Sequence, residues 1–236
     1  MNRPDVRHDP VLSPARSAGS VQPAEPDASA LPLADRLSSP VIPVIVVADA
    51  ADAVPLARAL LAGGVQALEV TLRTPAGLEA IRRIAAEVPE ALVGAGTVTR
   101  PAEMRAVRQA GAAFAFSPGW APELSDAARD EGIEFVPGVM TPSEAMAAAN
   151  RGHRALKLFP ASVAGGVPML KAMAGPFAEL RFCPTGGVTQ ENMAQYLALP
   201  NVFAVGGSWL TPADAIAGRD WPRITALAER AAAARG

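Results

Sequence analysis

The strongest constraint on the fold is an alternation of short apolar runs with helical patterns that begins near residue 40. Eight runs have the length of β-strands, and they span residues 41–47, 67–72, 91–98, 113–117, 134–137, 155–159, 180–183 and 202–205. Amphipathic, alanine-rich helical patterns follow them, for example at 52–62, 75–88, 101–110, 122–131 and 142–150. Strands that alternate with helices in units of about 20–25 residues predict an α/β fold with a parallel sheet.

The number of units favours a closed sheet over an open one. Eight strand–helix units within about 195 residues suit a compact (β/α)8 TIM barrel, and apolar strands indicate that both faces of the sheet are covered. An open doubly wound sheet would usually carry a glycine fingerprint after its first strand, whereas this run continues into Ala48, Asp49 and Ala50. We therefore predict one barrel domain over residues 36–236.

Residues 1–35 differ from this pattern. They are dominated by Pro, Ala, Ser, Asp and Arg and show no hydrophobic period, so they offer little apolar surface to offset the entropy of ordering. We predict a disordered N-terminal extension over residues 1–35. Residues 31–39 fit one short helix before the first strand.

Composition argues against several classes of function. The formal net charge of -2 argues against nucleic acid or an anionic membrane as a partner. The one cysteine, Cys183, lies in an apolar run and reads as a small buried hydrophobe in a reducing compartment. His8 and His153 lie far apart, so we expect neither a metal site nor a serine–histidine triad. No run approaches the roughly 20 apolar residues of a membrane helix, and we expect a cytoplasmic protein.

One lysine stands out because it interrupts an apolar strand. The chain has two lysines, of which Lys171 falls on a helical pattern and reads as a surface residue, while Lys157 lies within residues 155–159. Burying an ammonium group is costly, and burial favours the neutral amine, which is a nucleophile. Strand alternation sends Leu156 and Leu158 to the helices and Lys157 and Phe159 to the interior. Schiff-base chemistry or a purely structural ion pair would both fit this position.

A second strand supplies candidate partners for Lys157. In residues 68–74 (LEVTLRT), Glu69, Thr71 and Arg73 share one face and the apolar residues share the other. The apolar face should meet the helices, so the charged face should look into the barrel, with Arg73 near its mouth. A carboxylate near a buried amine can shuttle protons. The alternative is a structural Glu–Arg pair on a solvated edge strand.

The ends of the other strands suggest a ligand pocket. Glycines in residues 93–97 (VGAGT) allow close approach to the backbone, and the Thr97 hydroxyl is placed to hold a carboxylate beside Arg73. Pro118, in the turn at 117–119, would shape the pocket wall or form a plain turn. Paired glycines follow the seventh and eighth strands, where barrels bind phosphate; they are Gly186 with Gly187, and Gly206 with Gly207 followed by Ser208.

These blocks together resemble the 2-dehydro-3-deoxy-phosphogluconate (KDPG) aldolases, class I aldolases of the Entner–Doudoroff pathway. The resemblance runs from Val41 to about residue 234 and includes LEVTLRT at 68–74, VGAGT at 93–97, SPG at 117–119, KLFPA at 157–161, GPF at 175–177, RFCPTGG at 181–187 and GGSWL at 206–210. Several such blocks in order are far more specific than any one motif.

The resemblance implies a trimer of (β/α)8 barrels and assigns roles to residues. Lys157 would form the Schiff base, Glu69 would be the general acid and base, and no other cofactor or metal would be needed. The implied binding residues are Arg73 and Thr97 for the pyruvate carboxylate, Pro118 and Phe159 for the pocket wall, Thr185 beside them, and Gly186, Gly187, Gly207 and Ser208 for the phosphate.

The implied reaction cleaves 2-dehydro-3-deoxy-6-phospho-D-gluconate, a phosphorylated keto-acid, to pyruvate and glyceraldehyde 3-phosphate. Relatives that cleave 4-hydroxy-2-oxoglutarate or the phosphogalactonate epimer share this chemistry. Two other hypotheses remain, a phosphate-binding barrel isomerase or synthase in which Lys157 is only a charge partner, and a catalytically silent trimeric scaffold. The N-terminal extension has no counterpart in the typical aldolase, and Trp120 and Val163 lie in variable loops.

Overall fold

A computed structural model describes residues 32–234 of the chain, and strands and helices alternate through this range. The strands are β1 (Val41–Ile45), β2 (Ala67–Thr71), β3 (Leu92–Gly96), β4 (Phe114–Phe116), β5 (Glu134–Val136), β6 (Gly138–Val139), β7 (Ala155–Leu158), β8 (Arg181–Phe182) and β9 (Val205–Gly207). The helices are α1 (Leu33–Arg36), the 3-10 turn η2 (Ala50–Asp52), α2 (Ala53–Ala62), α3 (Gly77–Glu87), α4 (Pro101–Gln109), α5 (Pro122–Asp130), α6 (Pro142–Asn150), α7 (Gly166–Ala174), α8 (Met193–Leu197), α9 (Ala213–Ala217) and α10 (Trp221–Ala232).

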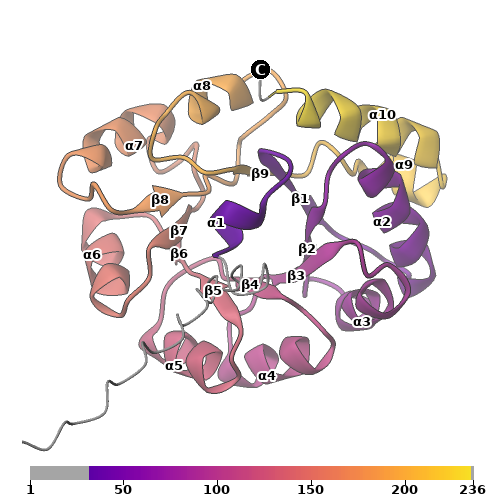
Figure 1. Cartoon of the computed structure of the whole chain (residues 1–236), viewed down its shortest axis with the longest axis horizontal. Coiled ribbons are helices and arrows are strands. Elements are labelled where there is room, and N and C mark those ends of the chain that lie inside the picture. Colours follow the sequence, from indigo (N-terminus) through magenta and orange to yellow (C-terminus); the bar gives the residue numbers. More distant parts are fainter. Residues whose placement is uncertain (1–31, 235–236) are drawn as a thin grey trace, which may run out of the picture. The chain divides into compact units, whose positions relative to one another are not determined.

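The strand pairings within the described residues are parallel. Six strands form one sheet in the order β5-β4-β3-β2-β1-β9, and three form another in the order β6-β7-β8. Two isolated parallel bridges link the second sheet to the first: Phe182 of β8 pairs with Val202, which precedes β9, and Thr185, which follows β8, pairs with Gly206 of β9. Figure 1 shows the strands curling around a common centre, with α1 over that centre and the other helices outside the strands. The predicted α/β fold with a parallel sheet is confirmed at this level.

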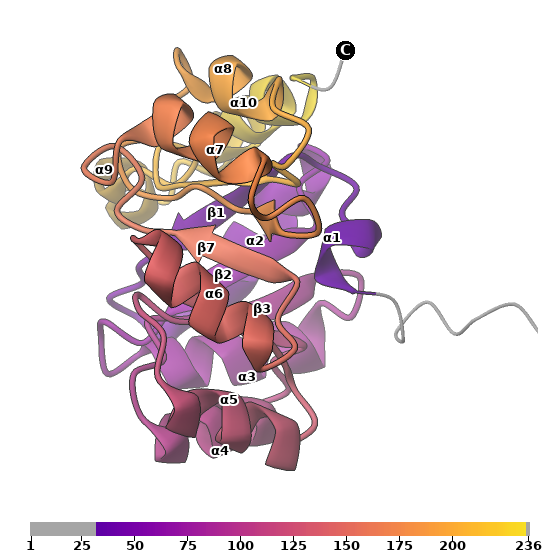
Figure 2. The ribbon, with the colours of Figure 1, turned by 90° about the vertical axis from the view of Figure 1, so that its left-hand side faces the viewer.

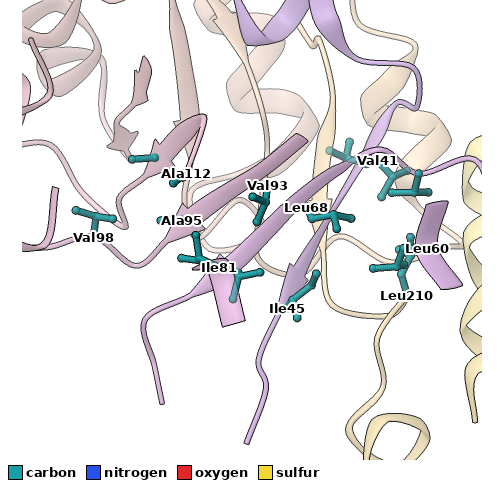
Figure 3. Close-up of a cluster of buried hydrophobic side chains, with 14 of the residues drawn as sticks. Val41, Ile45, Leu60, Leu68, Ile81, Val93, Ala95, Val98, Ala112 and Leu210 are labelled. Atoms are coloured by element: carbon teal, nitrogen blue, oxygen red, sulfur yellow. The ribbon is translucent and has the colours of Figure 1, made fainter. Parts of the chain in front are cut away.

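Strand alternation divides the apolar residues into an outer and an inner set. The outer set includes Leu68 of β2 and Leu156 of β7, which are fully buried in a large cluster with residues of the surrounding helices. Figure 3 shows part of it, where Ile45 and Leu68 of the strands lie near Leu60 of α2 and Ile81 of α3. This packing removes apolar surface from water and fixes which strand face meets the helices.

The inner set is closed at one end by α1. Leu33 of α1 is fully buried in a second cluster with Phe114, Phe116 and other inward-facing residues. The Leu33 backbone N–H donates to Glu134, the first residue of β5, and Arg36 forms an ion pair with the same carboxylate at 2.8 Å. Figure 2 shows α1 beside the ends of the strands opposite their arrowheads. Helix α1 therefore covers the amino-terminal end of the strands.

The predicted helix starts agree with the structure at three prolines, whereas the predicted bounds of the last strand differ from it at two glycines. Helices α4, α5 and α6 begin at Pro101, Pro122 and Pro142, as predicted, because the first helical turn needs no N–H donor there. The last strand begins at Val205 rather than at 202 and includes Gly206 and Gly207, which we had read as a loop. These glycines lie in a strand because Gly206 pairs with Ile42 and Gly207 with Pro43 of β1. A Cβ at Gly206 would overlap the Thr185 side chain, and one at Gly207 would overlap the Trp209 side chain.

The predicted extension lies mostly outside the described residues. The prediction of disorder covers residues 1–35, of which residues 1–31 are not described, and neither are 235 and 236. Residues 33–35 of the predicted extension belong to α1 in the structure, so the disorder prediction is wrong there, and α1 confirms the short helix predicted within residues 31–39. Within residues 32–234, none of the helices combines the length and apolar character needed to cross a lipid bilayer.

The start of α6 yields a prediction about acid stability. Glu144 accepts hydrogen bonds from the Met140 and Thr141 backbone N–H groups at 2.7 and 2.8 Å, and the Met140 bond is the main reason that the pKa of Glu144 lies below its ordinary value of 4.5. A lowered pKa in the folded state adds stability above the ordinary value, and that stability is lost as the pH falls through the folded pKa. Glu144→Gln should therefore lower the urea midpoint at neutral pH but not under acid conditions below the folded pKa.

The control for this experiment is Glu229→Gln, which alters an exposed glutamate near the end of α10. This variant should track the parent chain at both pH values. A stability deficit of Glu144→Gln that stayed constant on acidification would show that the charge of Glu144 does not stabilise the helix start.

Candidate active site

A buried ion pair lies at the centre of the inner face. Lys157 Nζ of β7 donates to Glu69 Oε1 of β2 at 2.9 Å, and the two side chains are 4% and 0% exposed. Both residues occupy inward-facing positions of their strands, as the alternation of side chains along β2 and β7 predicts. Every other ion pair among the described residues has at least one partner more than a quarter exposed. The second oxygen, Glu69 Oε2, is buried without a hydrogen-bond partner in the described chain, so it remains an available acceptor.

Two aromatic rings flank the lysine. The Nζ atom lies 5.1 Å from the ring centroid of Phe116 and 5.4 Å from that of Phe159. Phe159 was predicted to face inward, but Phe116 was not identified. Its signal in the sequence is the alternation of Phe114, Ala115 and Phe116, which places both rings of β4 on the inner face. These rings keep water from two sides of the amine.

Glycines of β3 make room for the large inner side chains. A Cβ at Gly94 would overlap the ring of Phe114, and a Cβ at Gly96 would overlap the Glu69 carboxylate. The register supports this, since Glu69 pairs with Gly94 across the β2–β3 ladder. We had expected the glycines to admit a ligand, whereas their contacts in the structure are with side chains of the protein.

The residue after β3 has a strained backbone and contacts Arg73. Arg73 Nε donates to Thr97 Oγ1 at 3.2 Å, so the two predicted carboxylate-binding residues meet. Thr97 has φ of 62°, in the left-handed region that a β-branched residue rarely adopts. Such strain costs about 1–3 kcal/mol and concentrates at binding and active sites. Arg73 is exposed, consistent with a place at the mouth.

The turn after β4 is fastened to the second sheet. Ser117 Oγ accepts from the Gly138 backbone N–H at 3.2 Å and donates to the Gly119 carbonyl at 2.5 Å. A Cβ at Gly138 would overlap the backbone of Pro118, so the turn and β6 are in close contact. Because Gly138 pairs with Lys157 in the ladder, this contact places Pro118 near the strand that carries the lysine.

The loop after β8 packs against the loop after β7. Gly186 and Gly187 have φ of 92° and 81°, a conformation that favours glycine. The Ser162 backbone N–H donates to the Gly186 carbonyl at 3.0 Å, and a Cβ at Gly187 would overlap the Ser162 side chain. Gly186 also lies near Phe159, since a Cβ there would be 3.4 Å from the ring. The predicted glycine loop thus adjoins the aromatic wall of the site.

The remaining predicted residues continue this arrangement. Thr185 is buried, and its backbone bridges to Gly206 of β9. Gly207 is the last residue of β9, and the exposed Ser208 follows it. Ser208 and Thr74 both line a cavity of about 420 Å³. Phe159 therefore connects Lys157 to Gly186 of the loop after β8, and Thr185 of that loop pairs with Gly206. Ser208 lines a cavity that neither Lys157 nor Glu69 lines.

The thiol of Cys183 is not suited to nucleophilic catalysis. It is fully buried, and burial raises the pKa of Cys183 to about 12, opposed in part by the nearby charge of Lys157. A thiol with such a pKa carries almost no thiolate at neutral pH. Within residues 32–234, His, Cys, Asp and Glu form no group of three or more that could hold a metal ion.

A protein-family model described as "KDPG and KHG aldolase" matches residues 35–227. The 2-dehydro-3-deoxy-phosphogluconate aldolase of Dickeya dadantii is 54% identical over 196 residues, which cover 83% of this chain and 92% of that protein. The KHG/KDPG aldolase of Escherichia coli K12 is 53% identical over 194 residues, covering 82% and 91%.

Solved structures agree with these relatives. The KDPG aldolase of Legionella pneumophila, with pyruvate captured at low pH as a covalent carbinolamine intermediate, has a TM-score of 0.81 and 48% identity, covering 83% of this chain and 95% of that one. A structure described as native KDPGal has a TM-score of 0.74 and 30% identity, covering 83% and 93%.

The contact between Gly96 and Glu69 yields a prediction. Gly96→Ala should force the Glu69 carboxylate away from Lys157 and destabilise the fold by about 1–3 kcal/mol, as overpacking of a buried site does. Thermal and urea unfolding would measure this loss. Gly175→Ala is the control, because a Cβ there meets nothing within 4 Å. Equal stability of the two variants would show that Gly96 is not needed to accommodate Glu69.

Proposed function

The chain belongs to the KDPG and KHG aldolase family, and we propose that it is a class I aldolase that cleaves 2-dehydro-3-deoxy-6-phospho-D-gluconate to pyruvate and D-glyceraldehyde 3-phosphate. The observation that carries the proposal is the buried contact of 2.9 Å between Lys157 Nζ and Glu69 Oε1. An amine nucleophile beside a proton acceptor, in a site largely shielded from water, is the arrangement that Schiff-base chemistry requires.

The first step forms the covalent intermediate. Lys157 transfers a proton to Glu69 Oε1 and attacks the C2 ketone of the substrate, which gives a carbinolamine. Loss of the C2 oxygen as water, with a proton returned by Glu69, leaves an iminium ion on Nζ. The short distance makes this transfer direct, and the buried setting strengthens the electrostatic control of each proton.

The second step breaks the carbon–carbon bond. Glu69, through a water molecule, removes the proton of the C4 hydroxyl, the C3–C4 electron pair moves into the iminium to give an enamine, and glyceraldehyde 3-phosphate leaves. The enamine then takes a proton at C3, and hydrolysis of the new iminium releases pyruvate and returns the amine. Glu69 Oε2 has no partner in the described chain, which suits it to hold that water.

Binding groups stand on both sides of the lysine. Arg73 uses only its Nε in the hydrogen bonds of the described residues, which leaves its terminal nitrogens for the substrate carboxylate, and Thr97 adds a hydroxyl. On the other side, Gly186, Gly187, Gly207 and Ser208 present backbone N–H groups and a hydroxyl to the phosphate. Phe159, Pro118 and Thr185 form the wall between them.

The flanking rings have a role in this scheme. Phe116 and Phe159 face the amine at about the distance of a cation–π contact, and they stabilise positive charge on Nζ. Positive charge is present on this nitrogen in the ammonium and in the iminium. We assign Phe116, like Phe159, to positioning and shielding the lysine.

The fold and assembly of the family extend the proposal. We propose that the two sheets act as one closed (β/α)8 barrel, with β5 and β6 counting as one strand and the bridges to Val202 and Gly206 completing the ring. We also propose a homotrimer in the cytoplasm. The single buried cysteine suits a reducing compartment, and exposed Val46, Met140 and Val163 follow strand ends and offer apolar contact surface.

Related substrates follow from the same chemistry. Because a relative at 53% identity carries the name KHG/KDPG aldolase, cleavage of 4-hydroxy-2-oxoglutarate to pyruvate and glyoxylate is a second activity of the proposed site. The lower identity to the KDPGal structure favours the gluconate over the galactonate epimer as the main substrate.

The lysine content of the chain permits a clean test of the nucleophile. Incubation with pyruvate followed by borohydride should fix one pyruvate-derived group on Lys157, and peptide mass mapping should find none on Lys171, the only other lysine. Lys157→Ala should remove the adduct and reduce turnover by several orders of magnitude, whereas Lys171→Ala should change neither.

Folding must be checked for the Lys157 variant, since it leaves a buried carboxylate unpaired. The trapping result on the parent chain does not depend on that variant. Labelling at another site, or none on a protein that still cleaves the substrate, would favour a role for Lys157 as a charge partner alone.

A separate prediction concerns Glu69. Glu69→Gln keeps the size of the side chain and a hydrogen-bond acceptor but removes the proton acceptor. It should lower cleavage of the phosphorylated substrate by about 10²–10⁴-fold, the usual worth of general acid–base catalysis. The amount of pyruvate trapped by borohydride after long incubation should be less affected, because it reports an end point and not a rate. An equal loss in both assays would indicate a structural role.

A further inference from the structure

A second cavity lies at the opposite end of the strands from the lysine. Its volume is about 530 Å³, and it is lined by the first residues of β5, β7 and β8 together with α1, α5 and the turn between α6 and β7. None of the residues assigned to the aldolase site lines it. Cavities of about 300–1,000 Å³ are typical of small-molecule sites.

The uncharged polar side chains that line this cavity, Ser125 and His153, are hydrogen-bonded to each other and to residues around them. Trp120 Nε1–H donates to Ser125 Oγ at 3.2 Å, so the Ser125 hydroxyl is free to donate to His153 Nε2, 2.8 Å away. His153 also hydrogen-bonds to the backbone of Phe135, and its ring meets the Phe135 ring edge to face. Burial lowers the pKa of His153, which keeps this ring neutral. The part of the lining formed by Ile133, Phe135, Ser125 and His153 therefore presents no unpaired polar side chain.

The rim of the cavity carries excess positive charge. Arg129 and Arg151 both donate to the same oxygen, Asp126 Oδ1, at 2.8 and 2.9 Å, so one carboxylate serves two guanidinium groups. Arg154 donates only to the carbonyls of Ala149 and His153 among the described residues. Arg181 is paired with Asp35.

The acidic side chains on the rim do not offset these arginines. The lining includes four arginines but only two acidic residues, Asp35 and Glu134. Glu134 is already paired with Arg36, which does not line the cavity. This charge distribution complements an anion whose remainder is apolar.

We propose that this cavity is a second ligand site, which takes a small amphiphilic anion with its flat apolar part against Phe135 and Ile133 and its carboxylate or phosphate on Arg154 and Arg151. The apolar part gains from leaving water, and the anionic head gains charge-assisted hydrogen bonds. The site is separate from the chemistry at Lys157.

Fluorescence titration of the full chain with anilinonaphthalene sulfonate tests the proposal. The expected result is one bound probe per chain, with affinity that falls as salt is raised. N-phenylnaphthylamine has the same rings without the sulfonate, and it should bind far more weakly. Equal affinity for the two probes would overturn the proposal, because the arginines would then contribute nothing.

Variants locate the site. Arg154→Gln should weaken binding of the sulfonate probe about tenfold, the usual effect of losing a charge-assisted contact. Ala155→Leu should abolish binding by filling the cavity. Arg82→Gln is the matched control, since Arg82 lies on α3 outside the cavity, and it should bind like the parent. All three should retain the parent rate of substrate cleavage.

Two further outcomes decide the matter. Displacement of the probe by naphthoate or by naphthyl phosphate identifies the preferred anionic head, and displacement by neither would overturn the proposal. Loss of probe binding after pyruvate is reduced onto Lys157 would also overturn it, because the probe would then occupy the aldolase site. The cavity proposal can fail while the aldolase proposal stands, and the reverse is equally true.

Discussion

The rest of the structure depends on one constraint, the burial of a lysine and a glutamate against each other. Each charge alone would be costly in a largely apolar interior, and their contact at 2.9 Å offsets part of that cost. A core made only for stability would place apolar side chains at both positions. The pair is retained where two parallel strands face the same space, and there it supplies a nucleophile and a proton acceptor together.

The space for this pair and its neighbours comes from glycines, which have no side chain. Gly96 accommodates the Glu69 carboxylate, Gly94 accommodates Phe114, and Gly138 lets the turn of Pro118 approach β6. Each glycine weakens its strand, because it has no side chain to pack and loses more conformational entropy on folding. Helix α1 acts in the opposite sense, since Leu33 fills the amino-terminal end of the interior. The interior is therefore filled by Leu33 at one end, and the exposed Arg73 lies at the other.

Periodicity predicted much of this arrangement, because the strand repeat of two residues decides which side chains face inward. It correctly predicted that Glu69, Lys157 and Phe159 face inward. The expectation that binding residues gather at the carboxyl ends of the strands correctly predicted that Arg73 lies beside Thr97. The use of glycine could not be predicted in the same way. A glycine that makes room for a neighbouring side chain looks the same in sequence as one that makes a turn, and so Gly206 and Gly207 were read as a loop. Phe116 was missed because an alternating Phe-Ala-Phe strand also suits an ordinary core.

The role of His153 could not be predicted from the sequence either. Because the two histidines are distant in sequence, the pattern gave no reason to connect His153 with Ser125, which the fold brings within 2.8 Å. A hydrogen-bonded serine and histidine suggest a nucleophile, but Trp120 already occupies the serine oxygen as a donor, which draws electron density away from it. The hydrogen bonds among these three side chains instead satisfy the uncharged polar groups of the cavity lining. What remains to attract a ligand is the positive charge of the rim, and for that reason the physical argument favours binding of an anion there over a second catalytic centre.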